Sequence, residues 1–328
     1  MKLISVLSTI LLTFFSVSTS FATENSVSLF YENDMGYSDK YATNSLKFQY
    51  TNLGDDFWLN IPQFALLRIF VSEENSKAFQ TVSVGQNMNV PRDIGLKVPP
   101  LTDRPYAGWL YLNMASHIAK ENALDTFAIT MGIVGRHSYA GDIQCWWHDI
   151  WNLKTPMGWD NQLEDEFGFV VSYKHSHRVF RKTFATSFEG DFILAGGTDL
   201  GNVIVQGYVS VLARFGYALP FSFDTNRIAY VSASDVVYKK RQEKMHAFLS
   251  AGIVARFVGH DIVLDGNVFA NSPYGVSSKW FVAEPMVGAS LSYCAWQTDF
   301  TLTYRTKEFK TQSDNHHIFW SATLKYSF

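Results

Sequence analysis

The amino-acid sequence predicts an all-β fold, a transmembrane antiparallel β-barrel of about twelve strands with long outer loops that carry short helices. Three observations predict it. Apolar and polar residues alternate with a period of two, over segments that reach about ten residues, the length a tilted strand needs to cross a membrane. Aromatic residues make up 16% of the chain and recur at strand ends, as in the girdles of membrane barrels. The chain begins with an export signal and ends on the aromatic Phe328, as bacterial outer-membrane barrels typically do.

The export signal occupies residues 1–22. Lys2 supplies the positive charge, Leu3 to Val17 form a mostly apolar stretch, and Ser20-Phe21-Ala22 places small residues at a signal-peptidase site. We expect cleavage after Ala22 and a single barrel domain over residues 23–328. The alternative is a buried helix or membrane anchor, for which the apolar run is short. A bacterial outer-membrane location follows from the signal and the barrel together.

The alternation is clearest in the last strand. Apolar Trp320, Ala322, Leu324, Tyr326 and Phe328 are separated by polar Ser321, Thr323, Lys325 and Ser327. A soluble, secreted sandwich would show the same pattern with its apolar face inward. A transmembrane barrel inverts it, with the apolar face toward lipid and the polar face toward the lumen. Export, strand length and the aromatic strand ends favour the barrel.

Twelve segments have strand character. They lie near residues 25–33, 43–52, 79–88, 107–118, 125–135, 166–175, 184–195, 203–214, 245–258, 280–292, 297–307 and 316–328. Because bacterial barrels have an even number of strands, the apolar segment 227–239 is placed outside the wall. Within residues 53–78, an apolar stretch after Pro62 predicts a short helix, packed on the barrel end or lying on the membrane surface.

Charge and cysteine content exclude several classes of protein. A net charge of −3 does not suit a nucleic-acid-binding chain. Two cysteines, Cys145 and Cys294, cannot build a disulfide scaffold or a four-cysteine zinc site, and they fall at opposite ends of the predicted barrel. We expect both to be free thiols. The sequence also contains no G-x-S-x-G, H-E-x-x-H or Walker A motif.

Strand count places the polar clusters on one rim. If both termini face the periplasm, each connection after an odd-numbered strand is extracellular. The clusters that fall there are Glu32 to Asp34, Asp39 to Asn44, Pro99 to Trp109, residues 136–165, Leu264 to Asn267 and Thr306 to Phe309. Their coincidence predicts a functional site at the outer rim.

His148 is the first candidate for chemistry. Gln144 and His148 are spaced i, i+4, so they share one face of a helical turn. A histidine has a near-neutral pKa and can act as a general base at the mouth of a polar lumen. The alternative is an ordinary solvated loop histidine.

A second candidate cluster lies at the end of the first strand. Glu32, Asn33, Asp34 and Thr43 offer carboxylate, amide and hydroxyl oxygens, which suit Ca²⁺ better than Zn²⁺. A Ca²⁺ ion there could polarise an ester carbonyl. The alternative is turn chemistry, since Asn and Asp are common turn residues. Strict alternation points Glu32 and Asp34 inward and Asn33 outward, toward lipid, which is a difficulty for a shared site unless the strand has already ended.

Basic residues near the rim are candidates for holding phosphate groups. Arg92, Lys97 and Arg104 lie in the connection between the third and fourth predicted strands. Arg104 also has a structural interpretation, because an inward Arg–Asp pair with Asp103 would stiffen the barrel interior.

These clusters resemble motifs of the outer-membrane lipid A 3′-O-deacylase (LpxR) family. Six segments match the family pattern in order. They are Glu32-Asn33-Asp34, Ser38 to Ser45, Asp103 to Tyr111, Gln144 with His148 and then Gly158 to Leu163, Leu264 to Asn267, and Arg305 to Phe309. The resemblance spans nearly all of the mature chain. It implies a twelve-stranded barrel and Ca²⁺-dependent hydrolysis of the 3′-linked acyloxyacyl group of lipid A, the lipopolysaccharide anchor in the outer leaflet.

The resemblance also implies roles for residues. His148 would be the general base that activates water, with Gln144 beside it, and Asn33, Asp34 and Thr43 would form the metal and oxyanion site. The metal ligands would be Asp34, Asn33 and Glu32. Lys40 and Ser45 are mild departures, but Lys154 stands where the family has a glutamate six residues after the histidine. Either Asp149 or Asp160 substitutes for that carboxylate, or the activity or substrate differs.

Two other functions compete with a lipid A deacylase. A non-enzymatic barrel, such as a channel or adhesin, would need no Ca²⁺, and a channel would have an open lumen. An outer-membrane phospholipase would use a Ser–His pair, and no serine shows a clear partner. In each case we expect a membrane-embedded monomer that binds no nucleic acid.

Overall fold

The computed structural model describes residues 25–34, 41–52, 76–224, 228 and 245–328. For Ala42, Thr43 and Ala185 it describes the backbone alone. Three predicted segments lie outside the described residues. They are the signal sequence, the part of the predicted helical segment 53–78 up to residue 75, and the segment 227–239 apart from Ile228. Within those residues no helix has the length and apolar character needed to cross a membrane.

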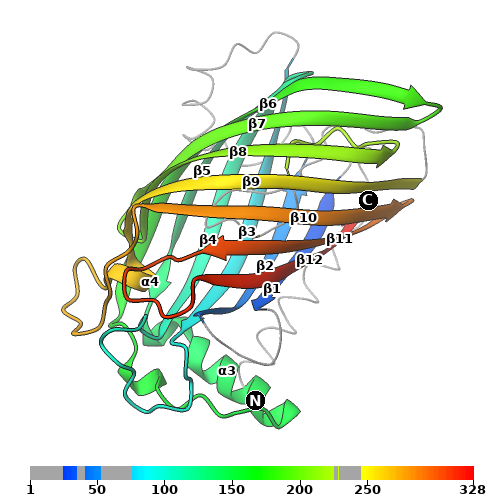
Figure 1. Ribbon diagram of the computed structural model, residues 1–328. Coiled ribbons are helices and arrows are strands. Elements are labelled where there is room, and N and C mark those ends of the chain that lie inside the picture. Colours follow the sequence, from blue (N-terminus) through cyan, green and yellow to red (C-terminus); the bar gives the residue numbers. More distant parts are fainter. Residues whose placement is uncertain (1–24, 35–40, 53–75, 225–227, 229–244) are drawn as a thin grey trace.

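Twelve antiparallel strands form a closed barrel, as predicted (Figure 1). They are β1 (Ser26–Asp34), β2 (Tyr41–Asn52), β3 (Lys77–Val90), β4 (Ala107–Ala119), β5 (Ala123–Val134), β6 (Glu166–Ala185), β7 (Phe188–Gly201), β8 (Ile204–Tyr217), β9 (Met245–Asp261), β10 (Phe281–Tyr293), β11 (Trp296–Thr306) and β12 (His316–Ser327). Each strand pairs with its neighbours in sequence, and β1 pairs with β12 to close the wall.

Helical segments lie in the connections that follow odd-numbered strands. Between β5 and β6 the chain forms η1 (Arg136–Ser138), α3 (Ala140–Trp151) and η2 (Trp159–Asn161), and α4 (Ile262–Asp265) follows β9. Figure 1 shows α3 and α4 at the same end of the barrel, away from the C-terminus. We refer to this end as the outer end and to the opposite one as the inner end.

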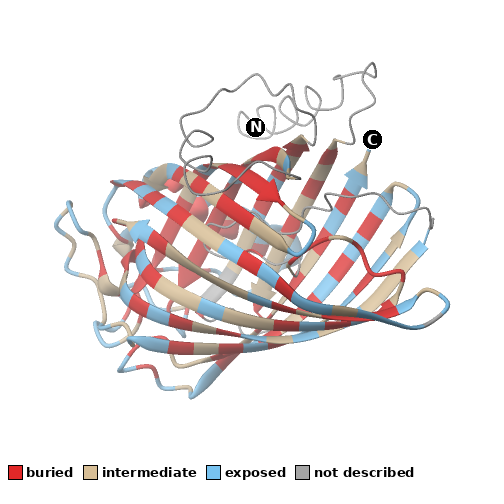
Figure 2. Ribbon diagram, turned by 90° about the horizontal axis from the view of Figure 1, so that it is seen from above, coloured by how far each residue is buried: buried red, intermediate tan, exposed pale blue. Residues whose placement is uncertain are grey.

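The wall has a polar inside and an apolar outside. In neighbouring strands Thr301 and Thr323 are buried while Phe300 and Leu324 are exposed, and buried and exposed residues alternate along the strands (Figure 2). Exposed apolar side chains on a closed barrel are stable where lipid surrounds the wall. The predicted inversion of the soluble pattern is therefore confirmed.

Ion pairs occupy the interior. Arg214 lies 2.6 Å from Asp191, and Arg178 lies 3.2 Å from the same carboxylate. Nearer the outer end, Arg305 and Arg256 both contact Glu284, at 2.7 and 3.2 Å. Buried charges are tolerated when they are paired, and here Asp191 links β6, β7 and β8 while Glu284 links β9, β10 and β11.

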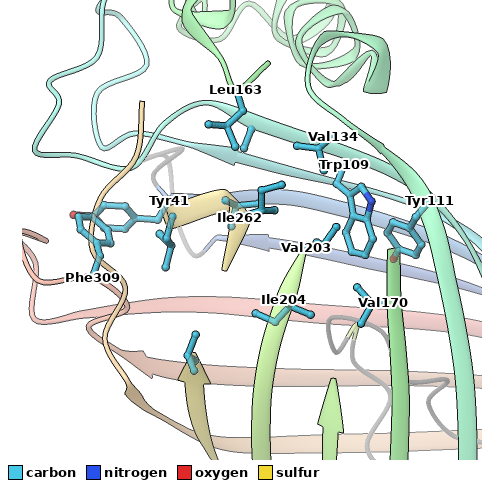
Figure 3. Close-up of a cluster of buried hydrophobic side chains, with 14 of the residues drawn as sticks. Tyr41, Trp109, Tyr111, Val134, Leu163, Val170, Val203, Ile204, Ile262 and Phe309 are labelled. Carbon is cyan, nitrogen blue, oxygen red and sulfur yellow. The ribbon is translucent and has the colours of Figure 1, made fainter. Parts of the chain in front are cut away.

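Apolar side chains close the outer end of the lumen (Figure 3). Helix α4 contributes Ile262, which lies among inward-facing side chains of the wall, including Trp109 and Ile204. Tyr41 packs edge-on against Phe309 of the last loop, with ring centroids 6.0 Å apart. This cluster fills the mouth with side chains from both halves of the wall.

Candidate functional site

Helix α3 packs on the outside of the barrel wall. Met88 and Val90 belong to the outward row of β3 that includes exposed Val84, yet both are buried because Ala140 and Ile143 of α3 cover them. Gln86, in the same row, donates a hydrogen bond to the carbonyl of Ser138 at 2.5 Å. The loop between β5 and β6 therefore turns back over the lipid-facing side of the wall at its outer end.

Gly108 permits this close approach. A Cβ atom at Gly108 would lie 2.1 Å from Ser138 Oγ and 2.4 Å from the Cβ of Ala140, far below normal contact distances. Ser138 is fixed by its own hydrogen bond to the carbonyl of Gly135 at 2.5 Å. The position of α3 on β4 thus depends on a residue without a side chain at 108.

Gln144 holds the segment that follows α3. Its Oε1 accepts a hydrogen bond from Trp159 Nε1 at 2.7 Å. The indole of Trp159 packs on Tyr106, with ring centroids 4.9 Å apart, and the Tyr106 hydroxyl donates to the carbonyl of Ile94 at 2.9 Å. Burial raises the pKa of the Tyr106 hydroxyl, so it stays protonated and donates. Gln144 therefore connects α3 to η2 and to the β3–β4 loop.

His148 is buried, with 3% of its surface exposed. Its Nδ1 lies 2.5 Å from the carbonyl oxygen of Lys154. Because a carbonyl can only accept, we assign the proton of the neutral ring to Nδ1, which makes Nε2 the basic nitrogen. Asn152 ends α3 in the left-handed conformation, at φ 50°, and this turn brings Lys154 back alongside the helix. The ring is thus held in the tautomer that a general base requires.

The side chain of Lys154 points to a different partner. Its Nζ lies 2.5 Å from Asp93 Oδ1 in the β3–β4 loop. The hydrogen bond from Lys154 lowers the pKa of the Asp93 carboxyl, with a further contribution from the backbone N–H of Gly95. Asp160 pairs with Arg136 at 3.1 Å on the surface, and Asp149 is exposed. The contact described for His148 Nδ1 is therefore a backbone carbonyl rather than either carboxylate.

Asn33 lies on the same outer face as α3. Its amide donates to the hydroxyl of Tyr31 at 2.7 Å, on the outward row of β1. Across the wall Asn33 pairs with Asn44 and Asn44 with Met88, and Met88 belongs to the same buried cluster as Ala140. With strands about 4.8 Å apart, two strand spacings, or about 10 Å, separate Asn33 from the row that α3 covers. Asn33 therefore points outward, as predicted, on the side of the wall on which α3 packs.

The other predicted ligands do not lie with Asn33. Glu32 points into the barrel, where it accepts hydrogen bonds from Ser321 Oγ and from the backbone N–H of Ile228, both at 2.6 Å. Asp34 is buried at the end of β1, and only the backbone of Thr43 is described, at a register shift of β2. Among the described residues, no three His, Cys, Asp or Glu side chains are close enough to hold a metal. Glu32 therefore lies on the inner side of the wall and Asn33 on its outer side, and the Ca²⁺ ligand set stays a prediction.

The residues predicted to hold phosphate groups lie in different surroundings. Arg104 is fully buried and contacts Glu308 at 3.4 Å, joining the interior network of Arg305 and Glu284. This placement assigns Arg104 to the interior rather than to a surface that a lipid phosphate could reach. Lys97 is exposed, and its backbone carbonyl accepts from Asn161 Nδ2 at 2.7 Å. Arg136 and Lys154, in the β5–β6 connection, and Arg92 and Lys97, in the β3–β4 loop, are exposed cations.

Sequence reasoning missed Asp93, Trp159 and the backbone of Lys154 as parts of the site. Tyr106 and Trp159 were within noted motifs, but nothing in their spacing showed that they stack. The two cysteines lie in α3 and in the β10–β11 turn, and both are free thiols.

The whole chain matches one family model. Residues 4–328 match the family described as outer membrane protein LpxR. Among solved structures, LpxR from Salmonella typhimurium superposes with a TM-score of 0.76 at 16% identity, covering 92% of this chain and 100% of that one. At this identity the likeness shows the fold alone.

Two autotransporter barrels are also similar. The β domain of Brka from Bordetella has a TM-score of 0.42 at 9% identity, covering 94% of this chain and 99% of that one. The translocator domain of NalP from Neisseria meningitidis has a TM-score of 0.39 at 11% identity, covering 100% and 96%. The search of curated protein sequences gave no match. Because the family model covers nearly the full length, the chain belongs to the LpxR family of outer-membrane proteins.

Proposed function

We propose that the protein is a lipid A 3′-O-deacylase that hydrolyses the 3′-linked acyloxyacyl ester of lipopolysaccharide, with His148 as general base. Family membership supports the activity. The observation that carries the assignment is the place of His148: buried on a helix that packs against the outside of the wall, with Nδ1 held by the carbonyl of Lys154. A base at this position is next to the outer leaflet, where lipid A lies, so the substrate would not have to enter the lumen.

The proposed reaction is an ester hydrolysis. Nε2 of His148 takes a proton from water as the water oxygen bonds to the ester carbonyl carbon. The tetrahedral intermediate then breaks its bond to the sugar 3′-oxygen, and the imidazolium returns the proton to that oxygen. The products are a carboxylic acid and a free hydroxyl. The carbonyl of Lys154 keeps the ring oriented through both proton transfers.

An oxyanion donor would have to come from the outer face of the wall. Asn33 presents an amide on that face, and its Nδ2 donates to the Tyr31 hydroxyl. Such a donor stabilises the charge that develops on the ester oxygen. Calcium, when bound near an ester, polarises its carbonyl, but the predicted ligands diverge here, so no step of the mechanism runs through a metal.

The apolar cluster at the outer end argues against a channel. Trp109, Ile262 and Phe309 close the mouth together with α4, which leaves little support for solute passage. The test is incubation of the purified protein with lipid A and, separately, with phosphatidylethanolamine, followed by mass spectrometry of the products. Release of the 3′ acyloxyacyl acid from lipid A supports the proposal. Release of fatty acid from the phospholipid alone would replace it with a phospholipase, and no release from either would overturn it.

A further inference from the structure

Helix α3 exposes one side made of large apolar side chains. Trp146, Trp147, Ile150 and Trp151, here called the tryptophan flank, are each 40 to 60% exposed. Spacings of three and four residues place them on one side of the helix. Their rings touch in a row, with centroids 6.4 Å apart for Trp146 and Trp147 and 5.7 Å for Trp147 and Trp151. Four large apolar groups in water would be costly.

The other sides of α3 differ in chemistry. Ala140, Gln144 and His148, four residues apart, form the buried side. Asp142 and Asp149, seven residues apart, lie on a third side and are exposed. A helix with one packed side, one apolar flank and one acidic flank has the pattern of a helix at a membrane surface, although its polar flank is acidic rather than basic.

The position of α3 brings the tryptophan flank next to the lipid-facing wall. The helix covers Met88 and Val90 at the outer end of β3. The same outward row continues to Val84, and the adjacent strand presents Leu112, both exposed on the outside of the wall. The apolar surface of the barrel is therefore continuous with the end of the wall on which α3 rests. Tryptophan is the residue most typical of the boundary between headgroups and acyl chains.

We propose that the tryptophan flank is embedded in the outer leaflet, at the boundary between headgroups and acyl chains, and that it anchors α3 parallel to the membrane. The occupant of this surface is bulk lipid. The acidic flank then faces water, and the packed side stays on the wall. The proposal does not depend on catalysis, since it concerns only how the helix sits in the bilayer.

Spin labels on α3 test the placement. In a Cys145→Ala/Cys294→Ala background, single cysteines replace Trp146, Ile150, Asp142 or Asp149, and a label at Leu112→Cys gives the lipid-facing reference. The labelled barrels are reconstituted in dioleoylphosphatidylcholine vesicles. Relaxation of each label by oxygen, which partitions into lipid, is compared with relaxation by a water-soluble nickel chelate. Heat-modifiable migration on gels verifies that each variant folds, and Ile150→Cys serves alone if Trp146→Cys does not.

The two flanks should behave oppositely. Labels at 146 and 150 are expected to show an oxygen-to-nickel ratio several-fold above that of labels at 142 and 149, and close to that at 112. Equal nickel access on both flanks would overturn the proposal by placing the tryptophan flank in water. A low access to both reagents at 146 and 150 would also overturn it, since it would show a protein contact instead of lipid.

Discussion

The backbone carbonyl of Lys154 accepts a hydrogen bond from Nδ1 of His148 at 2.5 Å. This contact orients the ring and fixes its tautomer without a carboxylate. Lys154 is the position of the more serious departure from the family pattern, where the family has a glutamate. The side chain of Lys154 pairs with Asp93 and its carbonyl accepts from the histidine, so the contact that orients His148 does not depend on the identity of the side chain at 154.

Replacing the Lys154 side chain should therefore have little effect on catalysis. Lys154→Ala keeps the carbonyl and removes only the surface ion pair, and exposed pairs contribute little. We expect kcat to stay within a few-fold of the wild-type value on lipid A, and Asp93→Asn to give the same result. A large loss of kcat in Lys154→Ala alone would show that the amine acts in the reaction.

Gly108→Ala should displace α3. The added methyl group would meet Ser138 and Ala140 at less than 2.5 Å, and overpacking of this kind costs about 1–3 kcal/mol. We expect reduced deacylation by a barrel that still shows heat-modifiable migration. Gly207→Ala is the matched control, because a Cβ at Gly207 would meet only the carbonyl of Gly197, at 3.9 Å. If both variants retain full activity, the position of α3 does not govern catalysis.

Gln144→Ala should weaken the link between α3 and η2. It removes the acceptor of Trp159 Nε1, whose hydrogen bond is worth about 1 kcal/mol and whose buried N–H would be left unpaired. We expect a lower kcat with unchanged migration on gels, and faster cleavage of the β5–β6 loop by protease. Gln144→Glu keeps an acceptor and should restore protease resistance. A variant Gln144→Ala with normal kcat and normal resistance would contradict this role.

Low pH should weaken the buried ion pairs near the outer end of the barrel. Burial raises the pKa of Glu308, but Arg305 and Arg104 outweigh it and hold that pKa below the ordinary value of 4.5. A carboxyl whose pKa is lower in the folded protein than in the unfolded chain stabilises the fold at pH values above its unfolded pKa. It loses that contribution as the pH falls through its folded pKa. We expect the temperature of heat modification to drop below pH 4.5, with a smaller drop in Glu308→Gln. An equal drop in both proteins would assign the effect to other groups.

Calcium dependence stays a prediction from the sequence. Chelation should abolish activity, and added Ca²⁺ should restore it. Because Glu32 is bonded to Ser321 and to the N–H of Ile228 in the interior, Glu32→Gln should leave the Ca²⁺ concentration for half-maximal activity unchanged. Full activity in the presence of chelator would remove calcium from the proposed function.

Most strand positions could be predicted because the lipid and the lumen impose a strict two-residue period. The prediction was wrong where this period breaks: β6 extends to Ala185 instead of residue 175, since register shifts after Arg178 and Thr183 change the phase. The rim location and the outward Asn33 could be predicted by the same alternation. The packing of α3 on the outer wall could not, because Met88 and Val90 look like lipid-facing residues, and only tertiary contact shows that Ala140 covers them.

The most direct test is the mass spectrum of lipid A from a bacterial host that expresses the wild-type protein or His148→Ala. The proposed mechanism predicts loss of one acyloxyacyl group from the 3′ position with the wild-type protein. In the variant, kcat should fall by about 10²–10⁴-fold, the contribution of a general base, while the barrel still migrates as a folded, heat-modifiable protein. Equal removal of the acyl group by a folded His148→Ala variant would contradict the base assignment, and unchanged lipid A with a folded wild-type protein would contradict the deacylase itself.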